Sequence, residues 1–130
     1  EAVAGQRLVV VEDSVVRGTP TRGTIGALRE AGAKEIHLRV ASPPIRHPCY
    51  FGIDFPDQKE LIAFTRSEDE IRKFIGVDSL RYLSLDGMLS CVKMPRDQYC
   101  TACFSGDYPI NVVEPVEKYA LERGQLRMFT

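Results

Sequence analysis

Two adjacent carboxylates, Glu12 and Asp13, stand directly after a short apolar run and before a loop of small and hydroxyl-bearing residues. Carboxylate oxygens can accept hydrogen bonds from sugar hydroxyls or bind a hard cation such as Mg2+. Ser14, Gly18 and Thr19, together with the free backbone N–H groups at a helix start, suit a phosphate group. The pattern therefore indicates a site for a phosphorylated sugar. The alternative is a capped turn between a strand and a helix that binds no ligand.

The four cysteines form a second set of reactive residues. No secretory feature accompanies them, so a metal or redox role fits them better than a disulfide framework. Cys100 and Cys103 form a C-x-x-C pair, a spacing that lets two thiolates meet one metal centre. Cys49 lies in an irregular segment, and the alternative for these three residues is reduced thiols without a metal. We expect Cys91, on a predicted helix with apolar neighbours, to be a small buried residue.

The remaining titratable residues give weaker signals. Arg17 adds positive charge to the loop after the acidic pair, and the alternative is that it points to solvent or to a neighbouring subunit. His37 alternates with apolar residues of a predicted strand, and His47 lies beside prolines. We expect both histidines to be surface or packing residues rather than catalytic bases.

Length and composition limit the class of protein. The 130 residues suffice for one compact domain. Lysine and arginine number 17 against 18 acidic residues, so the formal net charge of −1 offers no basic footprint for nucleic acid or a membrane surface. With 44% hydrophobic residues and no long apolar run, the chain is expected to fold without a transmembrane span. It starts with Glu1 and no signal-peptide pattern follows, so we expect it to be a piece of a longer polypeptide.

A strand, a helix and a second strand are predicted around the acidic pair. Residues 8–11 are β-branched and continuous, which predicts a strand buried on both faces of a parallel sheet. Pro20 is favoured at a first helical position, and the predicted helix ends at Gly32. The run 35–42 alternates in polarity and ends before Pro43. A parallel strand–helix–strand unit is the simplest arrangement.

The rest of the chain is predicted as short elements. Residues 45–57 are irregular, and Asp57 is expected to cap a short helix. Ser67 and Glu70 form a capping box for a second helix that ends at Gly76. The later segments, in chain order, are predicted as a strand at 80–83, a helix carrying Leu85, Met88, Leu89 and Val92, a long loop, and a weak helix at 116–123.

The segment 9–19 resembles the phosphoribosyl pyrophosphate signature of the type I phosphoribosyltransferases. Its second part, Ser-Val-Val-Arg-Gly-Thr at 14–19, is similar to the version in the glutamine phosphoribosylpyrophosphate amidotransferases, which begin purine synthesis. Other segments resemble that family in the same order, so that the resemblance extends from Leu8 to about Pro109. These segments are 29–34, 42–44, 50–54, 60–63 and 78–80.

The resemblance implies a role for each residue of the acidic loop. In the family the acidic pair meets the ribose hydroxyls and magnesium, and the loop wraps the 5-phosphate. Glu12, where the family commonly has Asp, and Asp13 would take the first role. The residues that would bind the phosphate are Ser14, Val15, Val16, Arg17, Gly18 and Thr19.

The resemblance also assigns the cysteines. One branch of the family holds a four-iron, four-sulfur (4Fe-4S) cluster, which is normally bound by four thiolates. Cys49, Cys100 and Cys103 match three of its ligand positions. The family's remaining ligand lies upstream of Glu1, and Cys91 matches no ligand position.

The fold class implied is α/β, a partial type I phosphoribosyltransferase fold with a C-terminal helical segment. Residues 1–130 would be the C-terminal part of a phosphoribosyltransferase domain, with the glutaminase domain absent. As part of a longer amidophosphoribosyltransferase, a glycosyltransferase, it would help make 5-phosphoribosylamine from phosphoribosyl pyrophosphate and glutamine, and alone it is expected to be inactive. The expected partners are the substrate, the rest of the chain and further copies in a homo-oligomer, in the cytoplasm, with no nucleic acid or membrane.

Two other classes of function remain open from the residues alone. The cysteines could form a metal-binding interaction module in which the acidic loop is only structural. The fold could also serve a nucleotide-binding regulator without catalysis. The amidotransferase interpretation alone explains the loop and the cysteines together.

Overall fold

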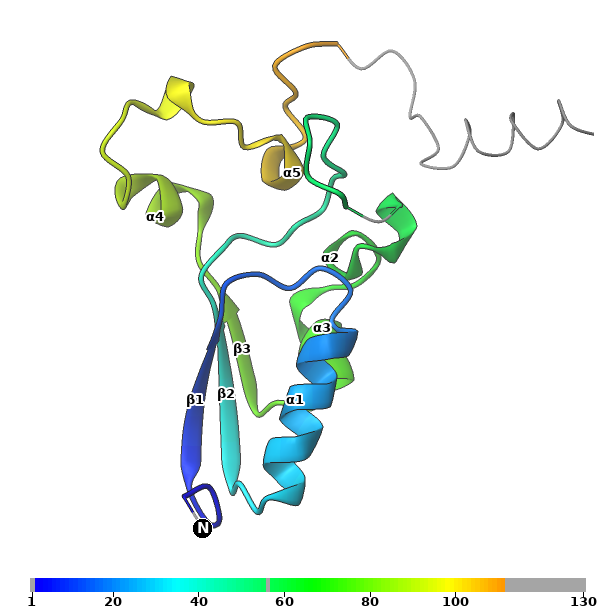
Figure 1. The fold of residues 1–130 in the computed structure, drawn as a ribbon, viewed down its shortest axis with the longest axis vertical. Helices are drawn as coiled ribbons and strands as arrows, with labels where there is room; N and C mark the ends of the chain where they lie inside the picture. The colour runs from blue at the N-terminus through cyan, green and yellow to red at the C-terminus, as the bar shows by residue number, and fades with distance from the viewer. Residues whose placement is uncertain (1, 56, 112–130) are drawn as a thin grey trace, which may run out of the picture.

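The computed structural model describes residues 2–55 and 57–111 (Figure 1). Within these residues, three strands form one parallel sheet in the order β1-β2-β3. The fold is therefore α/β with a parallel sheet, as predicted. In chain order the elements are β1 (Arg7–Glu12), α1 (Thr19–Glu30), β2 (Glu35–Val40), the 3-10 turn η1 (Gln58–Glu60), α2 (Ile62–Thr65), α3 (Glu68–Ile75), β3 (Ser79–Tyr82), α4 (Leu85–Ser90), the 3-10 turn η2 (Arg96–Gln98) and α5 (Ala102–Ser105).

The central strand β2 carries the core of the sheet. Ile36 and Leu38 are fully buried and Val40 is 3% exposed, whereas the residues between them are only half-buried. Leu38 pairs with Val10 of β1 on one side and with Leu80 of β3 on the other. These rows face α1 and α3, which cover the same face because both connections are right-handed crossovers between neighbouring parallel strands.

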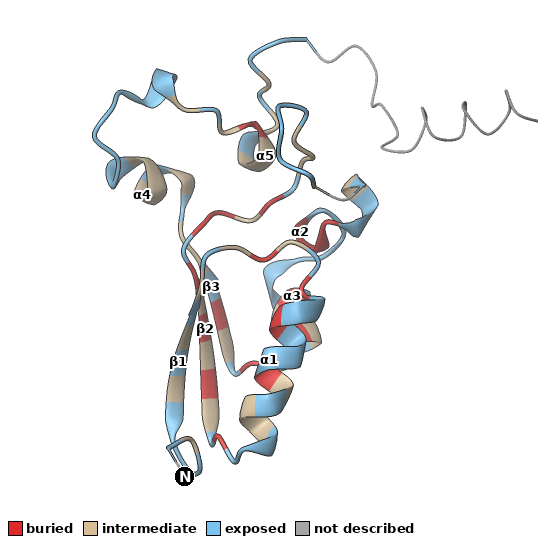
Figure 2. Cartoon of the chain, in the orientation of Figure 1, coloured by how far each residue is buried: buried red, intermediate tan, exposed pale blue. Residues whose placement is uncertain are grey.

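The prediction that β1 is buried on both faces is wrong. Val9 and Val11 are 67% and 70% exposed, and since their neighbours Leu8 and Val10 pack against the core, they lie on the other face of the sheet. Figure 2 shows exposed stretches along β1. A continuous apolar run cannot tell a strand covered on both faces from an edge strand covered on one. On the open face Arg7 donates to Glu35 at 2.7 Å, which lowers the pKa of that carboxyl.

The first helix follows its prediction closely. The predicted limits were Pro20 and Gly32, and α1 begins one residue earlier and ends at Glu30, with Gly32 in the left-handed conformation at φ 89°. Thr21 and Ile25 of α1 are buried, and Leu28, on the same side of the helix, packs partly against the core. One face of α1 therefore closes the sheet.

The capping box of α3 is also confirmed. The Ser67 hydroxyl accepts a hydrogen bond from the Glu70 N–H at 3.4 Å, and a Glu70 carboxylate oxygen accepts from the Ser67 N–H at 2.8 Å. Hydrogen bonds from the Ser67 hydroxyl and then its N–H lower the pKa of Glu70. Gly76 ends the helix in the left-handed conformation at φ 86°.

Three local expectations differ from the structure. Asp57 makes no side-chain cap, and the single helix expected after it is divided into η1 and α2. Cys91 is exposed rather than buried, because it follows α4, a helix in which no residue is buried. The segments η2 and α5 lie in the predicted loop, since elements this short show no helical periodicity. The weak helix expected at 116–123 lies outside the described residues.

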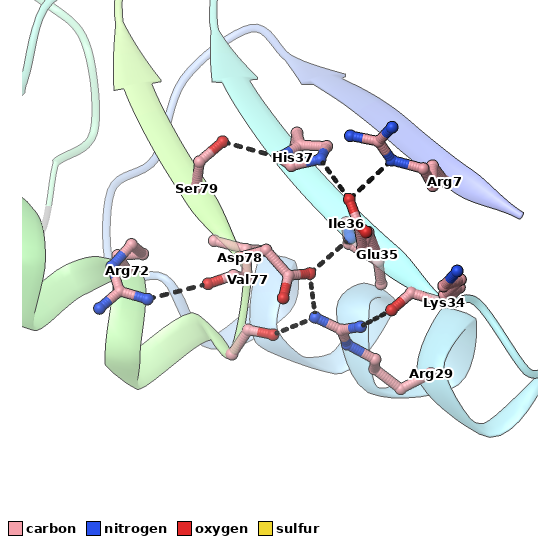
Figure 3. Close-up of polar contacts among 11 residues, drawn as sticks. Arg7, Arg29, Lys34, Glu35, Ile36, His37, Arg72, Val77, Asp78 and Ser79 are labelled. Carbon is pink, nitrogen blue, oxygen red and sulfur yellow. Dashed lines mark hydrogen bonds and ion pairs between the residues drawn. The ribbon is translucent and has the colours of Figure 1, made fainter.

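Asp78 connects three elements at the amino-terminal end of the sheet (Figure 3). It accepts hydrogen bonds from the buried Ile36 N–H at 2.7 Å and from Arg29, near the end of α1. Arg29 also donates to the carbonyls of Lys34 and Gly76. The hydrogen bond from Ile36, followed by the one from Arg29, lowers the pKa of Asp78.

We expect Asp78→Ala to lower the free energy of unfolding by about 1–3 kcal/mol, because it leaves the N–H of a buried residue without its acceptor. Urea denaturation followed by circular dichroism measures the change. The folded-state pKa of Asp78 is depressed. The contribution is therefore complete above the ordinary carboxyl pKa and is lost as the pH falls through the folded value.

Asp86→Ala is the matched control, since Asp86 is 84% exposed and pairs with Arg96 on the surface. It should change the free energy of unfolding by less than about 0.5 kcal/mol. An equally small effect of both variants, or a difference between wild type and Asp78→Ala that persists in acid, would contradict the role given to Asp78.

Candidate functional site

The predicted loop spans the gap between the carboxyl end of β1 and the start of α1. Ligands of open parallel sheets bind at this edge. A hollow of about 460 Å3 lies there. Its lining includes six of the eight predicted residues, and the full set is Glu12, Ser14, Val16, Arg17, Gly18, Thr19, Pro20, Thr21 and Thr24.

The other two predicted residues, Asp13 and Val15, are placed differently. The Val15 side chain is 2% exposed and belongs to the hydrophobic core, so it anchors the loop and leaves only its backbone for a ligand. Asp13 is exposed, and its carboxylate accepts a hydrogen bond from the Ser14 hydroxyl at 3.0 Å. The substrate-binding roles of all eight residues stay predictions.

Gly18 determines how closely the loop can approach the rest of the protein. It is buried at the N-cap position of α1 with φ 75°, in the left-handed region. A Cβ atom at Gly18 would lie 2.8 Å from Ile62 Cδ1 and 3.4 Å from Phe74 Cε1. Only glycine therefore combines this conformation with this contact.

Two contacts from distant residues hold the loop in place. The Ile62 N–H donates to the Val16 carbonyl at 2.9 Å. Arg17 Nε donates to Glu60 Oε2 at 2.8 Å. Sequence reasoning did not connect these residues to the loop. The one signal was the segment 60–63, which entered only as part of the family resemblance.

The arrangement is chemically suited to a phosphorylated sugar with a divalent cation. Glu12 brings a carboxylate to the hollow at the end of β1, and the first turn of α1 points its free backbone N–H groups toward the same space. Mg2+ is commonly held by one or two carboxylates together with substrate phosphate oxygens, so the carboxylate of Glu12 in the hollow suits it, whereas Asp13 does not line the hollow.

The cysteine segments pack against each other far from their positions in sequence. The N–H groups of Arg46 and His47 both donate to the Cys103 carbonyl, at 3.0 Å and 3.1 Å. The Tyr108 hydroxyl donates to the Pro48 carbonyl at 2.7 Å, and the ring centroids of Tyr50 and Tyr108 lie 5.1 Å apart. The segment 46–50 is therefore fixed to the segment 103–108.

This packing brings three thiols into one neighbourhood. Burial raises the pKa of the Cys103 thiol, and the nearby thiols of Cys49 and Cys100 raise it further. Within the described residues, no group of three His, Cys, Asp or Glu side chains surrounds a single point closely enough for one metal ion.

Among the described residues, no helix has both the length and the apolar character needed to cross a membrane.

Comparison with known proteins places this arrangement in a class. No family model matches the sequence. A solved glutamine phosphoribosylpyrophosphate amidotransferase from B. subtilis, complexed with ADP and GMP, superposes with a TM-score of 0.78 at 46% identity and covers 86% of this chain and 26% of its own. A second structure, described as the allosteric regulatory enzyme of purine biosynthesis, has a TM-score of 0.77 over 85% of this chain and 25% of its own. The fold is therefore a partial type I phosphoribosyltransferase fold.

Relatives in sequence are amidophosphoribosyltransferases. The amidophosphoribosyltransferase of Synechococcus elongatus is 49% identical over 121 residues, which is 93% of this chain and 24% of the relative. That of Methanothermobacter thermautotrophicus is 48% identical over 92% of this chain and 25% of the relative. The chain is thus a homologue of one part of the amidophosphoribosyltransferases, and it spans about a quarter of the length of these curated relatives.

We expect Gly18→Ala to destabilise the protein by about 1–3 kcal/mol and to weaken anion binding in the hollow, because the left-handed backbone and the contact with Ile62 both disfavour a Cβ atom. Thermal unfolding measures the first effect, and titration with ribose 5-phosphate measures the second.

Gly23→Ala is the control within the same helix. Gly23 has ordinary helical geometry and no atom within 4 Å of an added Cβ, so alanine should raise the free energy of unfolding by about 0.5–1 kcal/mol. If Gly18→Ala and Gly23→Ala change the free energy of unfolding in the same direction and by the same amount, the loop does not depend on the contact between Gly18 and Ile62.

Proposed function

We propose that this chain is the ribose-phosphate-binding part of an amidophosphoribosyltransferase, a glycosyltransferase that makes 5-phosphoribosylamine from phosphoribosyl pyrophosphate and glutamine in purine synthesis. In this proposal residues 1–130 are the C-terminal part of its phosphoribosyltransferase domain. The observation that carries the proposal is the hollow between β1 and α1, which is lined by residues of the predicted signature in a chain 49% identical to such an enzyme.

Different residues of the site bind different parts of the substrate. Glu12 and Asp13 bind the ribose hydroxyls and Mg2+, which, when bound, neutralises charge on the pyrophosphate that leaves. The loop 14–19 and the first turn of α1 surround the 5-phosphate with N–H groups, hydroxyls and the charge of Arg17. Both ends of the sugar are thereby oriented for attack by ammonia at the carbon that bears pyrophosphate.

Other parts of the proposal concern what this chain works with. A glutaminase domain elsewhere in the polypeptide supplies ammonia, so this chain alone does not use glutamine. The complete enzyme is a cytoplasmic homo-oligomer. These statements are supported by the family relationship and by the share of about a quarter of the relatives' length that the chain covers.

We further propose that Cys49, Cys100 and Cys103 are ligands of a four-iron, four-sulfur cluster, with a fourth thiolate from another part of the polypeptide. Their common neighbourhood and all-thiol chemistry support this assignment. Cys91, exposed at the end of α4, is left out of the set.

Asp13→Asn in the complete enzyme should reduce kcat/KM for phosphoribosyl pyrophosphate by about 100-fold or more, because the amide loses the charge that binds magnesium and weakens acceptance from a sugar hydroxyl. Steady-state kinetics with varied substrate and fixed Mg2+ measure this. Asp107→Asn, in the segment near the cysteines, is the matched control and should behave as wild type. Unchanged kinetics in Asp13→Asn would show that the acidic pair does not bind the substrate.

Cys100→Ser should abolish the visible charge-transfer absorption and the iron content of the complete protein purified without oxygen, because one iron loses its thiolate. Cys91→Ser should retain both. Absence of iron from the wild-type protein, or equal loss in both variants, would refute the cluster assignment.

A further inference from the structure

We propose that Glu60 is a positioning residue of the phosphate loop, which fixes the guanidinium of Arg17 in the orientation that receives the 5-phosphate. The inference rests on the proposed function and extends it to a residue outside the signature. It starts from the hydrogen bond of 2.8 Å between Arg17 Nε and Glu60 Oε2.

Arg17 pairs with Glu60 through its Nε atom, and this choice of atom affects the orientation of the whole side chain. A guanidinium is a planar fork in which Nε–H and one N–H of an outer nitrogen share a side edge, while the end of the fork carries further N–H groups of Nη1 and Nη2. Because the carboxylate of Glu60 binds the side edge through Nε, the orientation of the fork is restricted and the N–H groups at its end stay available to an anion. Arg17 is also one of the residues that line the hollow where the phosphate is proposed to bind.

Glu60 is itself held at a fixed place. It ends the turn η1, in which the Glu60 N–H donates to the Asp57 carbonyl at 2.8 Å. The next residue, Leu61, is fully buried, and the following N–H, of Ile62, donates to the Val16 carbonyl at 2.9 Å. The segment that carries Glu60 is therefore held to the loop by two hydrogen bonds. One is the backbone bond from Ile62 to Val16, and the other is the side-chain bond from Arg17 to Glu60.

Stability alone does not account for the contact. The side chains of Arg17 and Glu60 are 51% and 47% exposed, and ion pairs at such exposed positions contribute little to folding. What the pair does provide is one orientation for a long cationic side chain that would otherwise sample many. An arginine held in place before the ligand arrives loses less freedom on binding.

The test uses the complete amidotransferase with the variants Glu60→Ala, Glu60→Gln, Arg17→Ala and the double variant. Glu60→Ala should raise KM for phosphoribosyl pyrophosphate by about 3- to 30-fold and change kcat by less than about twofold. Glu60→Gln keeps an acceptor oxygen and should restore most of the affinity. With Arg17 already replaced by alanine, Glu60→Ala should have no further effect on KM, because the residue acts through Arg17.

Glu68→Gln is the control. Glu68, in α3, makes a similar exposed ion pair with Arg81 of β3. Its KM should equal that of wild type. Thermal unfolding of every variant reports whether the fold is kept.

Two outcomes would overturn the inference. A lower KM in Glu60→Ala would mean that Glu60 competes with the phosphate for Arg17, and an unchanged KM would mean that the contact has no role in binding. If Asp13→Asn still weakens substrate use, only the role of Glu60 fails. If Asp13→Asn is also without effect, the proposed function itself fails.

Discussion

Parallel pairing between β1 and β2, with Leu8 opposite Ile36 and Val10 opposite Leu38, determines where the candidate sites lie. Parallel strands need a crossover, and α1 provides it on the covered face of the sheet. The carboxyl ends of the strands consequently meet at one edge. The loop that leads to α1 leaves that edge after β1, and the segment that reaches Cys49 leaves it after β2. A change that disturbed this pairing would move both sites.

Local patterns predicted the elements whose causes are local. Three such features depend on residues a few positions apart: the start of α1 within one residue of Pro20, the capping box of Ser67 and Glu70, and the polarity alternation of β2. Exposure of Val9 could not be predicted, because it depends on what covers the second face of the sheet. The exposure of Cys91 could not be predicted either, because it depends on whether α4 packs against the core, and no residue of α4 is buried.

The candidate site shows the same division. The residue types at 12–19 indicated a sugar phosphate, and the structure gathers most of them around one hollow. The support from Glu60 is 43 positions away from Arg17 and follows no periodicity. Convergence of Cys49 with the C-x-x-C pair likewise depends on contacts such as that of Pro48 with Tyr108, which are 60 positions apart. Pairings of this range come from the fold rather than from local sequence.

The two sites also differ in when their residues become available during synthesis. The lining of the hollow lies within residues 12–24, and β2, which completes the strand–helix–strand unit around it, ends at Val40. Cys103 follows about 60 positions later, a delay of roughly 3 to 12 seconds at ordinary rates of translation. During that interval the nascent segment 46–50 lacks the contacts that it later makes with Cys103 and Tyr108. Any centre that requires all three thiols is therefore assembled after the chain segments that line the hollow have been synthesised.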